Sequence, residues 1–510
     1  MRGLLGSLVA AYAIAKMAVA PASFTITVPA RGDLQQALNA ARPGETILLE
    51  PSAVYVGSFV LPPRTGSDPR PIVVRTGGQD AVPAGQRMTR EASATLAKIQ
   101  SPDDTPALRT SPGSRFWRIE LMEFLPTRGG LGEIVALGDG STAQKTLDEV
   151  PTDLTIDRAY IHGDPRDGQK RGIALNSAET TISNSIIADI KAIGVDSQAI
   201  AGWNGPGGYL IENNYLEAAG DNFILGGTDP SIPGLTPTRI VVRGNTIAKP
   251  QAWHEAGSPW QIKNLFELKN ARDVTVERNI LERNWQAAQS GYAILFTVRN
   301  QDGACPWCQV EQVQFRQNIV RDVAAGVAIL GIDPNHPSRQ TSGILIQDNL
   351  FDRIDSRAWG GDGSWLQLTD RPRDITVDHN TVIQDTSNGV VKVDGPVAGF
   401  QFTNNIASHG AYGIIATNHG VGNDSIRASF PGATIARNVL AGGESGLYPP
   451  RNFFPSLQDF RRQFVNFEGG DFRVSPTSPW MRAGTDGLTL GAKLPPDPSL
   501  PIPQPLAWQD

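Results

Sequence analysis

The sequence predicts an all-β fold: a single-domain right-handed parallel β-helix, which is a solenoid of short coiled strands. Three observations predict it. One short phrase recurs along the chain, short alternating strands flank each copy, and residues that favour turns are abundant. The 510 residues include 53 Gly and 38 Pro, which is typical of a turn-rich chain with few helices. A solenoid accommodates this length in one domain, because each coil packs only on its neighbours.

The recurring phrase reads apolar, two mostly polar residues, Asn, any residue, apolar. Eight copies centre on Asn214, Asn245, Asn279, Asn318, Asn349, Asn380, Asn405 and Asn438, and two earlier copies carry Ala159 and Ser185 at the same place. Successive copies lie between 25 residues (Asn380 to Asn405) and 39 residues (Asn279 to Asn318) apart. Periods of about 20–50 residues are typical of solenoids and propellers. The varying period favours a coil with loops of free length.

An Asn at one place in every coil has a physical cause. Equivalent residues of a solenoid stack at the inter-strand spacing of about 4.8 Å. Asn tolerates the left-handed conformation that a tight bend requires, and its amide can bind the next Asn and the turn backbone. We therefore predict an Asn ladder.

With this repeat, roughly residues 110–445 resemble the right-handed parallel β-helix proteins typified by pectate lyases. The phrases at 202–207, 220–227 and 264–270 resemble those of a group of secreted bacterial β-helix proteins. The resemblance implies the fold and secretion, but it implies no reaction.

The ends of the chain predict a targeting segment and two caps. Residues 1–22 combine Arg2, an apolar run over 4–15 and an Ala-Val-Ala cleavage pattern at 18–20, which predicts a signal peptide. The β-helix is placed at 23–445, with a short capping helix over Asp33–Ala41, and a C-terminal cap and Pro-rich tail at 446–510. We expect a secreted or periplasmic protein with no membrane span after signal removal, since no other stretch approaches about 20 apolar residues.

The charge balance constrains the partner. A net charge of −6 does not provide the basic surface that nucleic acid requires. An acidic polysaccharide stays compatible, because a local basic groove can lie on an acidic protein. We expect a monomer whose partner is a polysaccharide, as substrate or as ligand.

A second strand is shared by the coils, for example at 222–226, 265–269, 295–299, 365–369 and 390–394. Strand alternation buries Phe266 and Leu268 and turns Glu267 and Lys269 outward. The same alignment makes Arg299, one coil later, the stacked neighbour of Lys269. We predict Lys269, Arg299 and Glu267 as catalytic residues. The alternative is a plain surface salt-bridge ladder.

Outward positions of the other coils predict a substrate-binding surface. They are Asn222, Gln367, Lys392 and Asp394. Trp203 lies on a Gly/Pro turn, where it could stack on a sugar ring or plug the core. His162 is the alternative catalytic base, because imidazole transfers protons near neutral pH.

No cofactor is certain, and calcium is left open. Asp221, Asp229 and Glu217 supply the carboxylate oxygens that calcium prefers, although the sequence has no D-x-D-x-D-G run. Cys305 and Cys308 are the only cysteines. No βαβ pattern surrounds this C-x-x-C, so a loop disulfide or two thiols are favoured over a redox site.

Two functions from different classes follow. The first is a polysaccharide lyase or epimerase: cations neutralise a uronic acid carboxylate, a base removes the neighbouring proton, and an acid assists the leaving oxygen. The second is a non-catalytic polysaccharide-binding or cell-surface structural β-helix. Hydrolysis is less favoured, because the Asn-Thr-Asp, Gly-His-Gly and Arg-Ile-Lys motifs of polygalacturonase-like hydrolases are absent.

Overall fold

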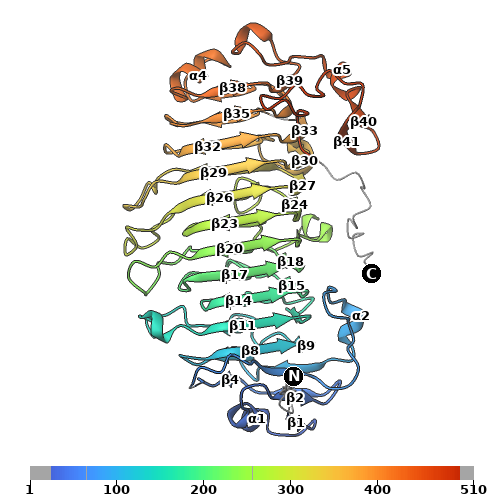
Figure 1. The fold of residues 1–510 in the computed structure, drawn as a ribbon, viewed down its shortest axis with the longest axis vertical. Helices are drawn as coiled ribbons and strands as arrows, with labels where there is room; N and C mark the ends of the chain where they lie inside the picture. The colour runs from blue at the N-terminus through green and yellow to red at the C-terminus, as the bar shows by residue number, and fades with distance from the viewer. Residues whose placement is uncertain (1–23, 65, 256, 387, 494–510) are drawn as a thin grey trace, which may run out of the picture.

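The structure is a computed structural model that describes residues 24–64, 66–255, 257–386 and 388–493. The predicted signal peptide and the end of the Pro-rich tail lie outside these residues. Each coil adds one strand to each of three parallel sheets, A, B and C, which run along the molecule (Figure 1). The chain passes from sheet A to B to C and then returns to A one coil further. This confirms the predicted right-handed parallel β-helix.

Within each sheet, the strands follow one another in chain order. Sheet A contains β1 (Thr25–Val28), β2 (Thr46–Leu49), β5 (Ile72–Thr76), β8 (Arg115–Glu120), β11 (Thr152–Asp157), β14 (Ala178–Ser183), β17 (Gly207–Glu212), β20 (Thr238–Arg243), β23 (Ala271–Glu277), β26 (Val310–Arg316), β29 (Ser342–Gln347), β32 (Arg373–Asp378), β35 (Gln401–Thr403) and β38 (Thr434–Ala436). Sheet B contains β3 (Val54–Val56), β6 (Ala97–Gln100), β9 (Met122–Phe124), β12 (Tyr160–His162), β15 (Ile186–Ile190), β18 (Tyr215–Ala218), β21 (Thr246–Ala248), β24 (Ile280–Asn284), β27 (Ile319–Val323), β30 (Leu350–Asp355), β33 (Thr381–Thr386), β36 (Ile406–Ser408) and β39 (Val439–Ala441). Sheet C contains β4 (Phe59–Leu61), β7 (Leu108–Thr110), β10 (Glu133–Leu137), β13 (Arg171–Leu175), β16 (Gln198–Gly202), β19 (Asp221–Leu225), β22 (Phe266–Leu268), β25 (Tyr292–Thr297), β28 (Ala325–Leu330), β31 (Leu366–Thr369), β34 (Val391–Val393) and β37 (Ile414–Ala416).

The core fills the inside of the coil with alternate residues of every strand. Phe266 and Leu268 of β22 are buried and lie in register with Ile294 and Phe296 of β25. The rings of Phe223 and Phe266 stack with centroids 5.2 Å apart. Burial of one such side chain stabilises the fold by roughly 1.5–3 kcal/mol relative to exposure. The hydrophobic core is therefore continuous along the axis.

The Asn ladder is confirmed, at the short turn between sheets A and B. From Asn214 to Asn438, each side-chain amide donates to the oxygen of the next ladder Asn at 2.9–3.1 Å. The backbone N–H of each ladder Asn donates to the same oxygen, as Asn214 does to Asn245. The two earlier copies also occupy ladder positions, since Ser185 N–H binds the Asn214 oxygen and Ala159 N–H binds the Ser185 hydroxyl.

The left-handed residue of this turn is not the ladder Asn, contrary to the prediction. It precedes the ladder Asn by one position, as at Arg278 (φ 54°) and Gln317 (φ 56°). The ladder Asn contributes its amide, while the residue before it makes the bend. The ladder also continues past the predicted positions, because Asn438 donates to Asn452 at 3.1 Å.

Both ends of the described solenoid carry packed segments. Asp33 caps the N-terminus of helix α1 (Leu34–Ala40), because its carboxylate accepts from Gln36 N–H at 2.8 Å. The helix buries Leu34 and Leu38 at the first coils. This confirms the predicted capping helix. The C-terminal segment contains the 3-10 turn η3 (Ser445–Leu447), helix α5 (Leu457–Arg461) and the hairpin β40 (Phe464–Asn466) and β41 (Asp471–Val474). Its aromatic side chains pack with outward residues of sheet B.

The remaining short helices lie in loops. They are α2 (Arg90–Ser93), α3 (Ser356–Trp359), α4 (Asn423–Ser429) and the 3-10 turns η1 (Leu147–Glu149) and η2 (Gln251–His254). Among the described residues, no helix has the length and apolar character that crossing a bilayer demands.

Arg87 binds the loop before α2 to turns between sheets A and B. Arg87 donates to the backbone and side-chain oxygens of Asn213, to the Thr246 hydroxyl and to the Gly244 carbonyl, at 2.9–3.1 Å. It thus joins segments more than 120 residues apart in the sequence.

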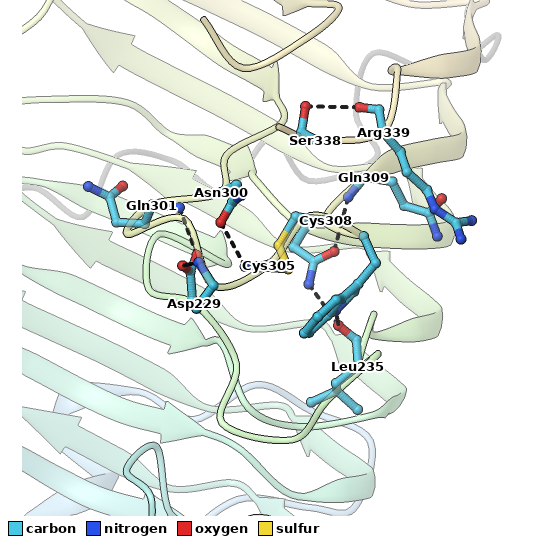
Figure 2. Close-up of a disulfide and its surroundings, with 12 residues drawn as sticks. Asp229, Leu235, Asn300, Gln301, Cys305, Cys308, Gln309, Ser338 and Arg339 are labelled. Atoms are coloured by element: carbon cyan, nitrogen blue, oxygen red, sulfur yellow. Dashed lines mark hydrogen bonds between the residues drawn. A yellow bond between two sulfur atoms is a disulfide. The ribbon is translucent and has the colours of Figure 1, made fainter. Parts of the chain in front are cut away.

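Cys305 and Cys308 form a buried disulfide, which decides between the two favoured predictions for this pair (Figure 2). Its loop is held from two sides. The Asn300 side chain accepts from Cys305 N–H at 2.7 Å. Asp229 accepts from the N–H groups of residues 301, 302 and 304 at 2.7–3.0 Å. The disulfide therefore belongs to a packed assembly of neighbouring loops.

Candidate functional site

The outward residues of sheet C form a column that follows the axis. Strand pairing aligns Glu267, Leu295, Ala328, Gln367, Lys392 and Ile415. Three residues predicted from the second shared strand therefore do lie on one face of one sheet. They fall into two groups: an acidic cluster around Glu267 and an open groove around Lys392.

The predicted alignment of the two strands is wrong by two residues, because β22 and β25 pair Leu268 with Phe296. Just after these strands the register shifts, and the Arg299 N–H donates to the Lys269 carbonyl at 3.0 Å. The two residues are therefore backbone neighbours. The error has a physical reason: β25 and the residues after it offer apolar side chains at 294, 296 and 298, and the pattern alone fits two registers. Arg299 instead pairs with Asp333, 3.2 Å from its carboxylate.

The acidic cluster contains two buried carboxyl groups. The Asn264 side-chain amide donates to Asp221 and to Glu267, at 3.2 Å each. Glu267 also accepts from the Thr297 hydroxyl at 3.1 Å and lies 3.7 Å from the Lys269 ammonium. Asp221 and Glu267 are only 1% and 2% exposed.

Burial and the charge of Glu267 raise the pKa of Asp221 to about 7. Buried carboxyl groups that share a site resist double ionisation. The cluster therefore exchanges a proton near neutral pH, and the Lys269 side chain lies beside Glu267.

The Asn222 side chain does not point outward, contrary to the prediction. Its side chain is fully buried. It donates to the carbonyls of Leu216 and Ala248 and accepts from the buried Lys249 ammonium at 2.9 Å. The tight bend between β18 and β19 turns this residue inward, and simple strand alternation does not anticipate the bend.

The open groove lies over the later strands of sheet C and has a volume of about 430 Å³. Its lining includes the predicted Gln367, Lys392 and Asp394, together with Tyr412 and His419. Tyr412 is 48% exposed. The Lys392 and His419 side chains are 38% and 44% exposed. The groove thus presents a cation, an aromatic face and several hydrogen-bonding groups to solvent.

A residue outside the groove lining supplies a counter-charge to Lys392. Lys392 forms an ion pair with Asp362, which follows α3. Burial would raise the pKa of Asp362, but the Lys392 ammonium and the neighbouring Ser364 hold it below its usual range. Lys392 is therefore oriented at the groove by a partner on another loop.

Two further predicted residues lie away from both groups. His162 is on sheet B, with Nε2 3.2 Å from Glu123 and Nδ1 2.8 Å from the Gly163 carbonyl. It does not join Lys269. Trp203 is on the early part of sheet C. Its indole N–H donates to the Gly140 carbonyl at 2.8 Å, and the Arg171 guanidinium lies 4.8 Å from the ring centroid. Trp203 therefore neither plugs the core nor reaches the groove.

The three carboxylates considered for calcium do not meet. Asp229 binds the disulfide loop, Asp221 binds Asn264, and Glu217 accepts from Asp189 N–H and the Tyr215 hydroxyl. In the described part of the chain, no three His, Cys, Asp or Glu side chains cluster as a metal site would require.

Sequence reasoning missed several members of these groups. Asn264 stands in the same phrase as Glu267 and Lys269, three residues before Glu267, which is a usable signal. Tyr412 and His419 lie in loops around β37, where strand alternation has no predictive power. Lys249 follows a short apolar strand, and nothing in that pattern indicates complete burial.

Comparison with known proteins concerns the fold. No protein-family model matches the sequence, and a search of curated proteins finds no match. Solved structures do match. Pectate lyase Pel9A shares 13% identity, with 92% of this chain and 96% of that chain covered and a TM-score of 0.37.

Two further structures are similar at the same low level. The catalytic unit of an α-1,3-glucanase from Streptomyces thermodiastaticus shares 13% identity over 84% and 70% of the two chains, with a TM-score of 0.47. An alginate lyase from Paenibacillus shares 14% over 78% and 96%, with a TM-score of 0.30. These scores are low, so the fold assignment rests on the strand pairing of this chain. That pairing makes the chain a right-handed parallel β-helix, the fold typified by pectate lyases.

Proposed function

We propose that this protein is carbohydrate-active and binds an acidic polysaccharide in the groove over β31, β34 and β37. The observation that carries the proposal is the combination of Lys392, Tyr412 and a row of hydrogen-bonding side chains in one solvent-open groove. Binding sites typically combine an apolar or aromatic surface with a few placed polar groups.

Each component of the groove fits a part of such a ligand. The exposed ring of Tyr412 provides an apolar face for a sugar ring and a hydroxyl at its edge. Lys392 provides a positive charge for a uronate carboxylate or a sulfate. Gln367 and Lys392 are neighbours in register on adjacent strands, so the groove offers side chains at the coil spacing of about 4.8 Å.

Export to an oxidising compartment is part of the proposal. The predicted signal peptide supports it, and so does the Cys305–Cys308 disulfide, because disulfides persist mainly outside the reducing cytosol. A polysaccharide ligand would be encountered there.

Affinity electrophoresis tests the binding proposal. The protein is run through gels that contain alginate, polygalacturonate, a glycosaminoglycan or a neutral glucan. We expect retardation by an acidic polymer and a loss of affinity of about tenfold, or 1.4 kcal/mol, in Tyr412→Ala and in Lys392→Ala. The exposed Lys145→Ala is the matched control. Retardation that survives both groove substitutions would place binding elsewhere and contradict the proposal.

A second candidate function is polysaccharide lyase or epimerase chemistry at the acidic cluster. The raised pKa of Asp221, with Glu267 and Lys269 beside it, favours it. Paired titratable groups with shifted pKa values are typical of acid–base catalysis. Incubation of acidic polymers with the protein in heavy water would separate the two reactions. A lyase yields products that absorb in the ultraviolet, whereas an epimerase incorporates deuterium without chain cleavage. Neither signal, or either signal unchanged in Asp221→Asn, would remove this candidate.

A further inference from the structure

The ammonium of Lys249 lies in a shell of five oxygen atoms. The side chain follows β21 and is fully buried. Nζ lies 2.9 Å from the Ala218 carbonyl, 3.0 Å from that of Ala219, 2.7 Å from that of Gly220, 3.1 Å from that of Asn264 and 2.9 Å from the Asn222 side-chain oxygen. Three of these carbonyls belong to consecutive residues and point at one atom.

The shell exceeds what a lysine needs. An ammonium has three N–H donors, so five oxygens at these distances surround it as a cation and do not merely accept its hydrogen bonds. All five are neutral carbonyl or amide oxygens. Rings of backbone carbonyls are how proteins replace the hydration shell of a monovalent cation.

The charged form of Lys249 fits this environment. Burial lowers the pKa of Lys249, and the negative charge of Asp221 opposes that shift. Because all five neighbours are acceptors, a neutral amine would direct its lone pair at an oxygen. A positive charge at this point also offsets the repulsion between the three carbonyl oxygens that converge on it.

We propose that these five oxygens form a monovalent-cation site that the chain fills with its own side chain, so that the Lys249 ammonium is a tethered cation. The site is built from residues 218–222, which span the end of β18, the bend and the start of β19, and from Asn264 before β22. Asp221 lies within the first of these segments. The tethered cation therefore holds the backbone under the acidic cluster in place.

Removal of the ammonium tests the proposal by chemical rescue. Lys249→Ala empties the shell, while Lys249→Met leaves an uncharged chain of similar length in it. Thermal unfolding of the full-length variants and the wild type is measured in choline chloride, sodium chloride, potassium chloride and ammonium chloride at one ionic strength. A cation that binds only the folded state raises its stability with concentration.

We expect Lys249→Ala to unfold at a lower temperature than the wild type in choline chloride. Ammonium or potassium should recover about half of that loss in unfolding temperature, because a cation that binds the folded state stabilises it. The unfolding midpoints of Lys249→Met and of the wild type should change little from one salt to another. Equal midpoints of Lys249→Ala in all four salts, or a rescue of Lys249→Met as large as that of Lys249→Ala, would overturn the proposal.

The proposal can also be tested if the variant fails to fold. If Lys249→Ala does not fold in choline chloride, its refolding yield by size-exclusion chromatography becomes the measured quantity. A higher yield in ammonium or potassium than in choline would support the tethered cation. Equal yields in all four salts would overturn it.

Discussion

Asp221 and Glu267 accept hydrogen bonds from one donor, the side-chain amide of Asn264. Burial and the charge of Glu267 raise the pKa of Asp221 to about 7, whereas an unfolded Asp titrates near 3.9. Between these two values the folded state keeps a proton that the unfolded state releases. The contribution of Asp221 to the free energy of unfolding therefore falls as the pH rises from about 4 to about 7.

Replacement of the Asp221 carboxyl group should remove its part of the fall in the free energy of unfolding with rising pH. We expect Asp221→Asn to gain stability relative to the wild type across this pH range, by up to about 4 kcal/mol at its upper end. Urea unfolding at several pH values from about 4 to 8 measures it. Glu468→Gln, whose side chain is 81% exposed in the wild type, is the control and should follow the wild type. A constant difference between Asp221→Asn and the wild type at every pH would contradict the assignment.

An interior rung of the Asn ladder should matter more than its last one. Asn318→Ala leaves the backbone and side-chain N–H groups of Asn279 without their acceptor, and each orphaned buried donor costs roughly 1–3 kcal/mol. We expect a loss of about 2–4 kcal/mol in the free energy of unfolding by urea. The matched variant Asn452→Ala, at the partly exposed end, should lose clearly less. Similar losses in the two variants would show that rungs act independently of burial.

The Arg87 contacts should control local opening of the loop before α2. Arg87→Ala removes four hydrogen bonds to the turns around Asn213 and Gly244. Since local segments open with their own free energies, we expect proteolytic nicking within residues 77–95 to accelerate while global unfolding changes less. The exposed neighbour Gln86→Ala serves as control. The idea fails if both variants are cleaved at the wild-type rate.

The disulfide should stabilise its loop modestly and resist reduction in the native state. Cys305 and Cys308 are 0% and 1% exposed, so thiols should appear only when the protein unfolds. For such a short loop, the chain-entropy argument gives about 2 kcal/mol. The double variant Cys305→Ser/Cys308→Ser should lose about that much in urea unfolding. Rapid appearance of titratable thiols when a mild reductant is added to the folded wild type would contradict the burial argument.

The fold was predictable because its signal repeats. One phrase that recurs in ten coils, with Asn at its centre in eight, predicts both the solenoid and its ladder, and hydrogen bonds at the same positions confirm it. The capping helix was also predictable, since Asp33 and the apolar spacing after it are local signals.

The site was less predictable, because it depends on register and on loops. The strand 292–297 admits two alignments with 266–268, and only the observed pairing decides between them. The Arg299 side chain pairs with Asp333, which no strand pattern anticipates. Asn222 follows the bend between β18 and β19, and its side chain is buried against Lys249 where alternation predicts an outward direction. Tyr412 and Lys392 come from separate coils, and the loops that bring them to one groove carry no periodic pattern.

The ladder also bears on how such a chain changes length. Every rung from Asn245 to Asn438 makes the same contacts with the rung before and after it, and within the three sheets each coil pairs only with its neighbours. A duplication or excision that begins and ends at ladder positions would restore an identical junction. Whole coils can therefore be added or lost by one genetic event, and the molecule would grow along its axis as a stack of interchangeable layers.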